Sequence, residues 1–230
     1  MFIVCVCLCI SCGQLISTMI LSTFGYTSTI SVQPTTIYAL SLQKNEHQSA
    51  VEDFKIQLQS QNGAGFVYEK DNCFYLISSL YENINDAELV KNNLKNNGVD
   101  SEILKITLES QTIEGNFSSD EKTVLNNAFK ATYETYKKMY DLAISLDTNL
   151  IDKSKAKLNA SEIYSNLVAL KTNFETIFNQ KSEQLETLKN HLSYACEVLS
   201  NLVSEQYETQ NQTFSSLIKL SYCKILLNTY

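Results

Sequence analysis

The feature that most constrains the fold is an ordered series of strand and helix patterns between residues 36 and 108. Four β-rich runs are interspersed with two stretches in which apolar residues recur at helical intervals. The strand patterns are residues 36–42, 65–69, 73–81 and 101–108, and the helical patterns are residues 50–58 and 87–97. Lys70-Asp71-Asn72 supplies a hairpin turn, and Gly98 supplies a left-handed helix end. This order predicts a small α+β domain of βαββαβ (ferredoxin-like) topology, in which an antiparallel sheet carries both helices on one face.

Residues 74–81 read Phe-Tyr-Leu-Ile-Ser-Ser-Leu-Tyr, and Ala87, Leu94 and Gly98 follow them. This set resembles the second half of the SPOR domain, in which Tyr-Arg-Val-x-Val-Gly-Pro-Phe is followed by Ala, Leu and Gly at the same intervals. Tyr38–Gln43 is more loosely similar to the first strand of the family. The SPOR domain is the small cell-wall-binding module of bacterial division and sporulation proteins. Over residues 36–109 the resemblance therefore implies the same fold, with peptidoglycan as the ligand.

The two faces of the predicted sheet can be assigned because side chains alternate along a strand. Leu40, Leu42 and Leu76 are predicted to face the helices. The opposite face, called the open face below, would meet the ligand. We predict that it carries Ser41, Tyr68, Tyr75 and Ile77 as glycan-binding residues. An aromatic ring beside hydroxyl groups suits a sugar, and it equally suits docking onto a neighbouring helix.

The sequence also departs from the family pattern on its strands. Ser41 replaces a Gln of the first strand, Gln43 replaces the Gly after it, and Ser79-Leu80 replaces the Gly-Pro pair of the third strand. These changes leave a second interpretation open, in which the module has become a scaffold.

Composition and motifs exclude several classes of function. The net charge is −7 and the chain has no Arg, so it lacks the clustered basic residues that bind nucleic acid. Neither His47 nor His191 lies near a Gly-x-Ser-x-Gly turn or a ligand-spaced cysteine. Gly63-Ala64-Gly65 lacks the Lys-Ser/Thr of a phosphate loop. We therefore predict a non-enzymatic protein with no catalytic residues, no metal and no cofactor.

The N-terminal segment, residues 1–24, is strongly apolar, and no charged residue precedes Lys44. About twenty apolar residues suffice to cross a bilayer as a helix. The segment is therefore predicted to be a transmembrane or signal-anchor helix in the lipid bilayer, followed by a Ser/Thr-rich tether over residues 25–35. Two alternatives are a cleaved signal peptide, although its basic n-region is missing, and a lipid anchor at Cys12. With the resemblance, this predicts a single-pass cell-membrane protein whose soluble region is extracytoplasmic.

The region from residue 118 to residue 230 is predicted to be all α-helical. It contains neither Gly nor Pro, and it begins with the capping-box pattern Ser118-x-x-Glu121. Apolar residues at spacings of three and four predict either a three- or four-helix bundle, with a break near residues 179–182 or residue 211, or a coiled coil. The aromatic residues Tyr133, Tyr136 and Tyr140 lie at helical spacing, which is typical of core or interface positions.

Together these patterns predict a membrane-anchored bacterial protein that binds peptidoglycan through a SPOR-like module in cell division or sporulation. The alternative is a structural protein in which the module is degenerate and the C-terminal helices contact a helical partner or a second copy of the chain. An apolar stripe left exposed on those helices would favour the alternative.

Overall fold

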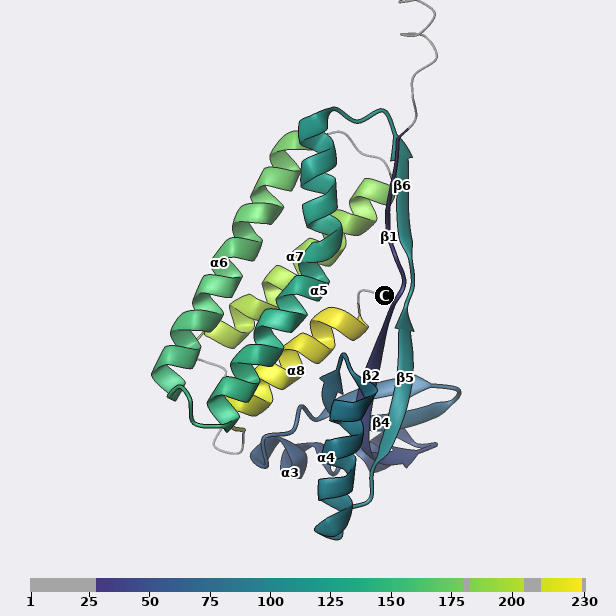
Figure 1. Ribbon diagram of the computed structural model, residues 1–230, viewed down its shortest axis with the longest axis vertical. Coiled ribbons are helices and arrows are strands. Elements are labelled where there is room, and N and C mark those ends of the chain that lie inside the picture. Colours follow the sequence, from purple (N-terminus) through teal and green to yellow (C-terminus); the bar gives the residue numbers. More distant parts are fainter. Residues whose placement is uncertain (1–27, 180–182, 205–211, 229–230) are drawn as a thin grey trace, which may run out of the picture.

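The computed structural model describes residues 28–179, 183–204 and 212–228, and the statements below concern these residues (Figure 1). The predicted order of strands and helices in the module is confirmed. It consists of β2 (Thr35–Asn45), α2 (Gln48–Glu52), α3 (Lys55–Ser60), β3 (Phe66–Lys70), β4 (Cys73–Tyr81), α4 (Ile84–Asn96) and β5 (Glu102–Leu108). Two short helices, α2 and α3, stand where the pattern predicted one.

The strands form an antiparallel four-stranded sheet in the order β3-β4-β2-β5. Asp71 and Asn72, which join β3 to β4, have φ values of 52° and 58°, as a tight hairpin turn requires. Gly98 ends α4 with a φ of 76°. The predicted helix-facing side chains are confirmed, because Leu40 packs with Ala87 of α4 and Leu76 packs with Val51 of α2.

A two-stranded ribbon extends the sheet beyond the predicted module. It pairs β1 (Ser28–Val32), which lies in the predicted tether, with β6 (Gln111–Gly115), which lies between the predicted module and the predicted helical region. Ile30 and Ile113 are opposite each other in the ribbon and are buried, and β1 contacts α5 (Ser119–Asp147). Figure 1 shows the ribbon running alongside the helices.

Four helices of the described region form the predicted bundle. They are α5, α6 (Lys153–Ile177), α7 (Glu183–Val203) and α8 (Phe214–Leu227). Helix α6 ends at Ile177, close to the predicted break at residues 179–182, and α7 ends at Val203; residue 211, where the other break was predicted, lies outside the described residues. The predicted capping box is present, since the Ser118 hydroxyl accepts from the Glu121 amide and the Glu121 carboxylate accepts from the Ser118 amide. Helix α8 is buried along almost its whole length and contacts α5, α7, α3, β3 and β4.

The membrane part of the predicted fold class is corrected. Among the residues that the structure describes, no helix is both long and apolar enough to cross a membrane. The most apolar one, α8, has 14 residues, whereas a transmembrane helix needs about twenty. The segment predicted to span the bilayer, residues 1–24, lies outside the described residues. The single-pass membrane location is therefore not supported.

The capping box gives a first prediction. Replacing Ser118 by Ala should lower the free energy of unfolding by about 1 kcal/mol, because the first turn of α5 loses its side-chain acceptor. Urea denaturation followed by circular dichroism measures this change. The exposed neighbour Ser119 is the matched control, and an equal loss in Ser119→Ala would contradict the prediction.

Candidate ligand-binding site

The predicted open face of the sheet is not open. Ser41 and Ile77 are 0 % exposed, and Tyr75 is 5 % exposed. Tyr68 is half-buried, and burial followed by the nearby Asp71 carboxylate raises the pKa of its hydroxyl. The expectation that these four side chains form an accessible surface was therefore wrong for three of them.

The reason is that the sheet curls. The pairing of β2 with β4 shifts register between Leu40 and Ser41 and again between Ser41 and Gln43. Such bulges bend strands and increase their twist. The two outer strands, β3 and β5, consequently approach each other, and the Lys70 ammonium donates to the Lys105 carbonyl at 3.3 Å. In a flat sheet three strand spacings would separate these strands by about 14 Å, farther than a lysine side chain extends.

The concave side of the curled sheet is filled by its own side chains. They belong to one buried cluster that continues into the helical bundle; its members from the sheet are Ile37, Ala39, Phe66, Tyr75, Ile77, Leu80 and Ile106. The face that the resemblance assigns to ligand binding is thus a hydrophobic core in this chain.

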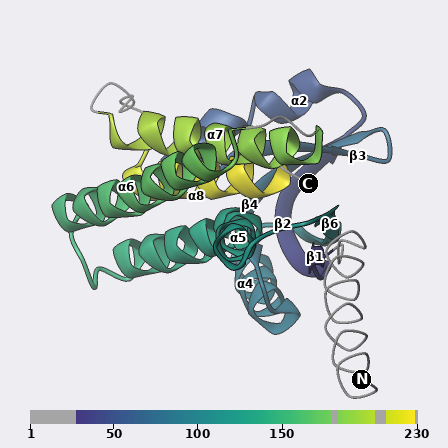
Figure 2. The ribbon, with the colours of Figure 1, turned by 90° about the horizontal axis from the view of Figure 1, so that it is seen from above.

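The bundle docks on the other face of the sheet, which carries the helices of the module. Ser79 pairs with Leu40 across the strands, so both side chains lie on the face that α4 covers. The Ser79 hydroxyl shares a buried hydrogen bond of 2.7 Å with the hydroxyl of Tyr222 from α8. In the view of Figure 2, α8 lies between α2 and α4.

A cluster of tyrosines surrounds this hydrogen bond. The ring centroids of Tyr136 and Tyr222 are 5.5 Å apart, and those of Tyr81 and Tyr140 are 6.1 Å apart. Burial raises the pKa of Tyr140 to about 12 and raises those of Tyr136 and Tyr222 well above their ordinary value. The sequence-based expectation that Tyr136 and Tyr140 are core or interface residues is confirmed.

One end of the curled sheet remains accessible. A shallow hollow of about 250 Å³ lies there, lined by Ser41, Leu42, Gln43, Lys44, Asp100, Ser101 and Glu102. The strand register puts Glu102 beside Ser41 in one row and Lys44, Tyr75 and Tyr68 in the next row. The Lys44 ammonium lies 5.0 Å from the centroid of the Tyr75 ring and thus covers it.

The hollow presents hydroxyl, amide, ammonium and carboxylate groups at short range. The Ser41 hydroxyl already donates its hydrogen bond to the Gln43 carbonyl at 2.8 Å, so its proton is not available to a ligand. The Ser101 hydroxyl oxygen is buried and has no hydrogen-bond partner within the described part of the chain. A hydrogen bond with Tyr75 raises the pKa of Lys44, so this side chain is a cation at neutral pH. Such a set can donate to and accept from a polyhydroxylated ligand.

Of the predicted residues, Ser41 lines this hollow, whereas Tyr68 lies in the row of Lys44 and Tyr75 and is not among the lining residues; sequence reasoning missed Lys44, Ser101 and Glu102. Strict alternation puts residues 41 and 44 on opposite faces. The bulge at Leu42 places Lys44 on the same face as Ser41, and no local sequence pattern predicted that bulge. Across the described residues no group of His, Cys, Asp and Glu side chains could hold a metal ion.

Comparisons with known proteins do not assign the chain to a family. No family model matches the chain, and no curated protein matches it. A similar solved structure is the solution structure of the peptidoglycan binding domain of the B. subtilis cell wall lytic enzyme CwlC. The two chains are 12% identical, the match covers 33% of this chain and 95% of that one, and the TM-score is 0.28. A likeness at this level supports no argument about the ligand.

The buried Ser79–Tyr222 pair gives a second prediction. Tyr222→Phe and Ser79→Ala should each lower the free energy of unfolding by about 1–2 kcal/mol, because each leaves a buried hydroxyl without this partner. The double variant should lose less than the two single losses together, which urea denaturation of all four proteins would measure. Strictly additive losses would show that the two hydroxyls do not interact.

The tyrosine cluster gives a third prediction, on pH dependence. A tyrosine whose pKa is raised by folding stabilises the folded state fully below the unfolded pKa of about 10 and loses this contribution as the pH rises through the folded value. The unfolding free energy should therefore fall between about pH 10 and pH 12. Denaturation at stepped pH tests this. Tyr136→Phe should make the fall shallower, because it removes one of the tyrosines whose pKa is raised by burial. The Tyr136 hydroxyl has no hydrogen-bond partner in the described chain, so its removal breaks no hydrogen bond.

Proposed function

We propose that this protein binds cell-wall glycan without catalysing a reaction, and that the glycan contacts the accessible end of the curled sheet. Two observations support the proposal. The element order of the module is the one that the SPOR resemblance implies, and the hollow at its end is built from sugar-compatible polar groups. The observation that carries most weight is the hollow itself, because it brings Ser101, Glu102 and Lys44 together.

Each group has a distinct part in the proposed recognition. The partly buried ring of Tyr68, in the same row as Lys44 beside the hollow, offers its accessible edge to a sugar ring. The Glu102 carboxylate accepts hydrogen bonds from sugar hydroxyls, and the unpartnered Ser101 hydroxyl makes a further one. Lys44 adds a positive charge, which attracts the carboxylates of a cell-wall polymer.

The proposal of binding without catalysis follows from the arrangement of the acids. Glycoside hydrolysis uses two carboxylates that flank the scissile bond. Asp100 and Glu102, the two acids of the hollow, lie two residues apart, Asp100 just before β5 and Glu102 at its first position, and not on opposite walls of a cleft.

Co-sedimentation with purified cell-wall sacculi is the test, and it gives a fourth prediction. The wild-type chain should sediment with sacculi, and Tyr68→Ala and Glu102→Gln should each raise the apparent Kd roughly three- to tenfold, as expected for one lost polar or stacking contact. Tyr75→Ala is unsuitable because Tyr75 is buried, and its loss would leave a cavity.

Matched controls separate a binding defect from a folding defect. Phe54→Ala removes an aromatic ring that is 48 % exposed, and Glu88→Gln removes an exposed carboxylate of α4. Both should bind sacculi like the wild type, and all variants should keep the wild-type melting temperature. Absence of wild-type sedimentation, or equal losses in the controls, would refute the proposal.

A second candidate function is a non-enzymatic interaction protein that acts through its helices. The observation in its favour is a group of exposed apolar side chains around the turn between α5 and α6. These are Ile144, Leu150 and Leu158, which are 42 %, 76 % and 61 % exposed. If the wild-type chain does not bind sacculi, this candidate is favoured, and the module then serves as a scaffold for the bundle.

A further inference from the structure

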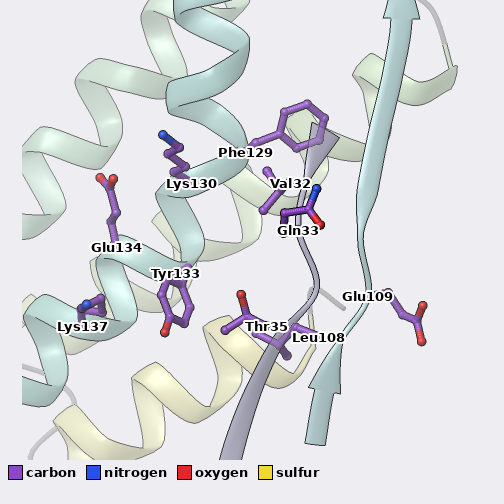
Figure 3. Close-up of a pocket in the computed structure, with 10 residues that line it drawn as sticks. All are labelled: Val32, Gln33, Thr35, Leu108, Glu109, Phe129, Lys130, Tyr133, Glu134 and Lys137. Carbon is purple, nitrogen blue, oxygen red and sulfur yellow. The ribbon is translucent and has the colours of Figure 1, made fainter. Parts of the chain in front are cut away.

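A second hollow lies against the middle of α5, where the four-stranded sheet gives way to the ribbon (Figure 3). It encloses about 300 Å³. Both chain segments leave regular strand pairing here. Residues 33–34 separate β1 from β2, and residues 109–110 separate β5 from β6. The ribbon packs on α5 through Ile30, so the interruption leaves the space between helix and strands unfilled.

The floor of this hollow is apolar and partly aromatic. Phe129 and Tyr133 stand one turn apart on α5, and Val32 and Leu108 line the strand side (Figure 3). Phe129 and Leu108 are each 3 % exposed, so the packing of the protein fixes their positions. A volume of this size is at the low end of the range for small-molecule sites.

Charged groups of both signs lie along the same helix. Lys130 and Glu134 are one turn apart, and Lys137 follows them (Figure 3). The Lys137 ammonium is 3.4 Å from the Glu82 carboxylate and 5.8 Å from the centroid of the Tyr133 ring, so its charge is already balanced. Glu109 points away from the other lining residues in Figure 3. The charged groups left to meet a ligand are the Lys130 ammonium and the Glu134 carboxylate, both exposed; Figure 3 shows them on the side of α5 away from Phe129 and Leu108, so a ligand would meet them at the solvent-facing edge of the hollow.

The hollow also has neutral hydrogen-bonding groups. Burial, followed by the nearby Glu82 carboxylate, raises the pKa of Tyr133 to about 12, so its hydroxyl keeps its proton at neutral pH. Thr35 adds a second hydroxyl on the strand side. The Tyr133 hydroxyl already has a hydrogen bond with the Glu82 carboxylate, so Thr35 is the neutral donor left for a ligand that sits over the apolar floor.

We propose that this hollow binds an α-amino acid with an aromatic or branched apolar side chain. The side chain lies between Phe129, Val32 and Leu108. The carboxylate of the ligand meets Lys130, and its ammonium meets Glu134. A sugar is disfavoured here because its hydroxyls would face an apolar floor without partners. The site is separate from the glycan-binding hollow and does not depend on it.

Isothermal calorimetry on the full chain with L-phenylalanine tests the proposal. Phenethylamine, which lacks the carboxylate, and 3-phenylpropionate, which lacks the ammonium, are the comparison ligands. We expect saturable binding of L-phenylalanine and binding of each comparison ligand that is weaker by roughly two- to fivefold, the factor that one solvent-accessible ion pair supplies. Lys130→Gln should weaken phenylalanine binding by a similar factor and leave phenethylamine binding unchanged.

Lys138→Gln, on the same helix, is the matched control and should bind like the wild type. No saturable binding of L-phenylalanine by the wild type would overturn the proposal. Equal affinity for the three ligands, or an equal loss in Lys138→Gln, would also overturn it. Sacculus binding by Lys130→Gln should match the wild type, so failure here and failure of the glycan proposal are distinguishable.

Discussion

The curl of the four-stranded sheet determines much of what this protein can do. Two shifts of register between β2 and β4 bend the strands until β3 and β5 come within reach of a lysine side chain. The concave side then closes over Tyr75 and Ile77, which a flatter sheet would present to a ligand. Because this side is filled, accessible polar groups are confined to its end, where Lys44 and Glu102 lie. The bundle packs on the opposite face.

The docking of α8 joins the module and the bundle into a continuous core. An isolated helix of 14 residues is only marginally stable in water, and here α8 gains its stability from burial against α5, α7 and the sheet. The Ser79–Tyr222 hydrogen bond fixes how α8 meets β4, since two buried hydroxyls are satisfied only in that register. Within the described residues, the core therefore passes from sheet to bundle without a break.

Both proposed sites lie where regular strand pairing is interrupted. The hollow beside Ser101 begins at the bulge in β2, and the hollow beneath Phe129 lies at the gap between β2 and β1. At such places backbone and side chains cannot pack as tightly as within a sheet, and side chains of unlike chemistry come together. The two hollows differ in their residue types: the shallow one is lined mostly by polar residues, and the other by aromatic and aliphatic residues with charged residues along its helix.

The sequence by itself determined the local structure. The hairpin at Asp71-Asn72, the helix end at Gly98 and the cap at Ser118 depend on residues close together in the chain, and all three were predicted. Helix-facing Leu40 and Leu76 were also predicted, because alternation needs only local periodicity. Tertiary structure alone decided the bulges, the closure of the sheet and the partner of Ser79, because these depend on contacts between residues distant in sequence. A bulge of one residue shifts Lys44 to the other face, and no local pattern records it.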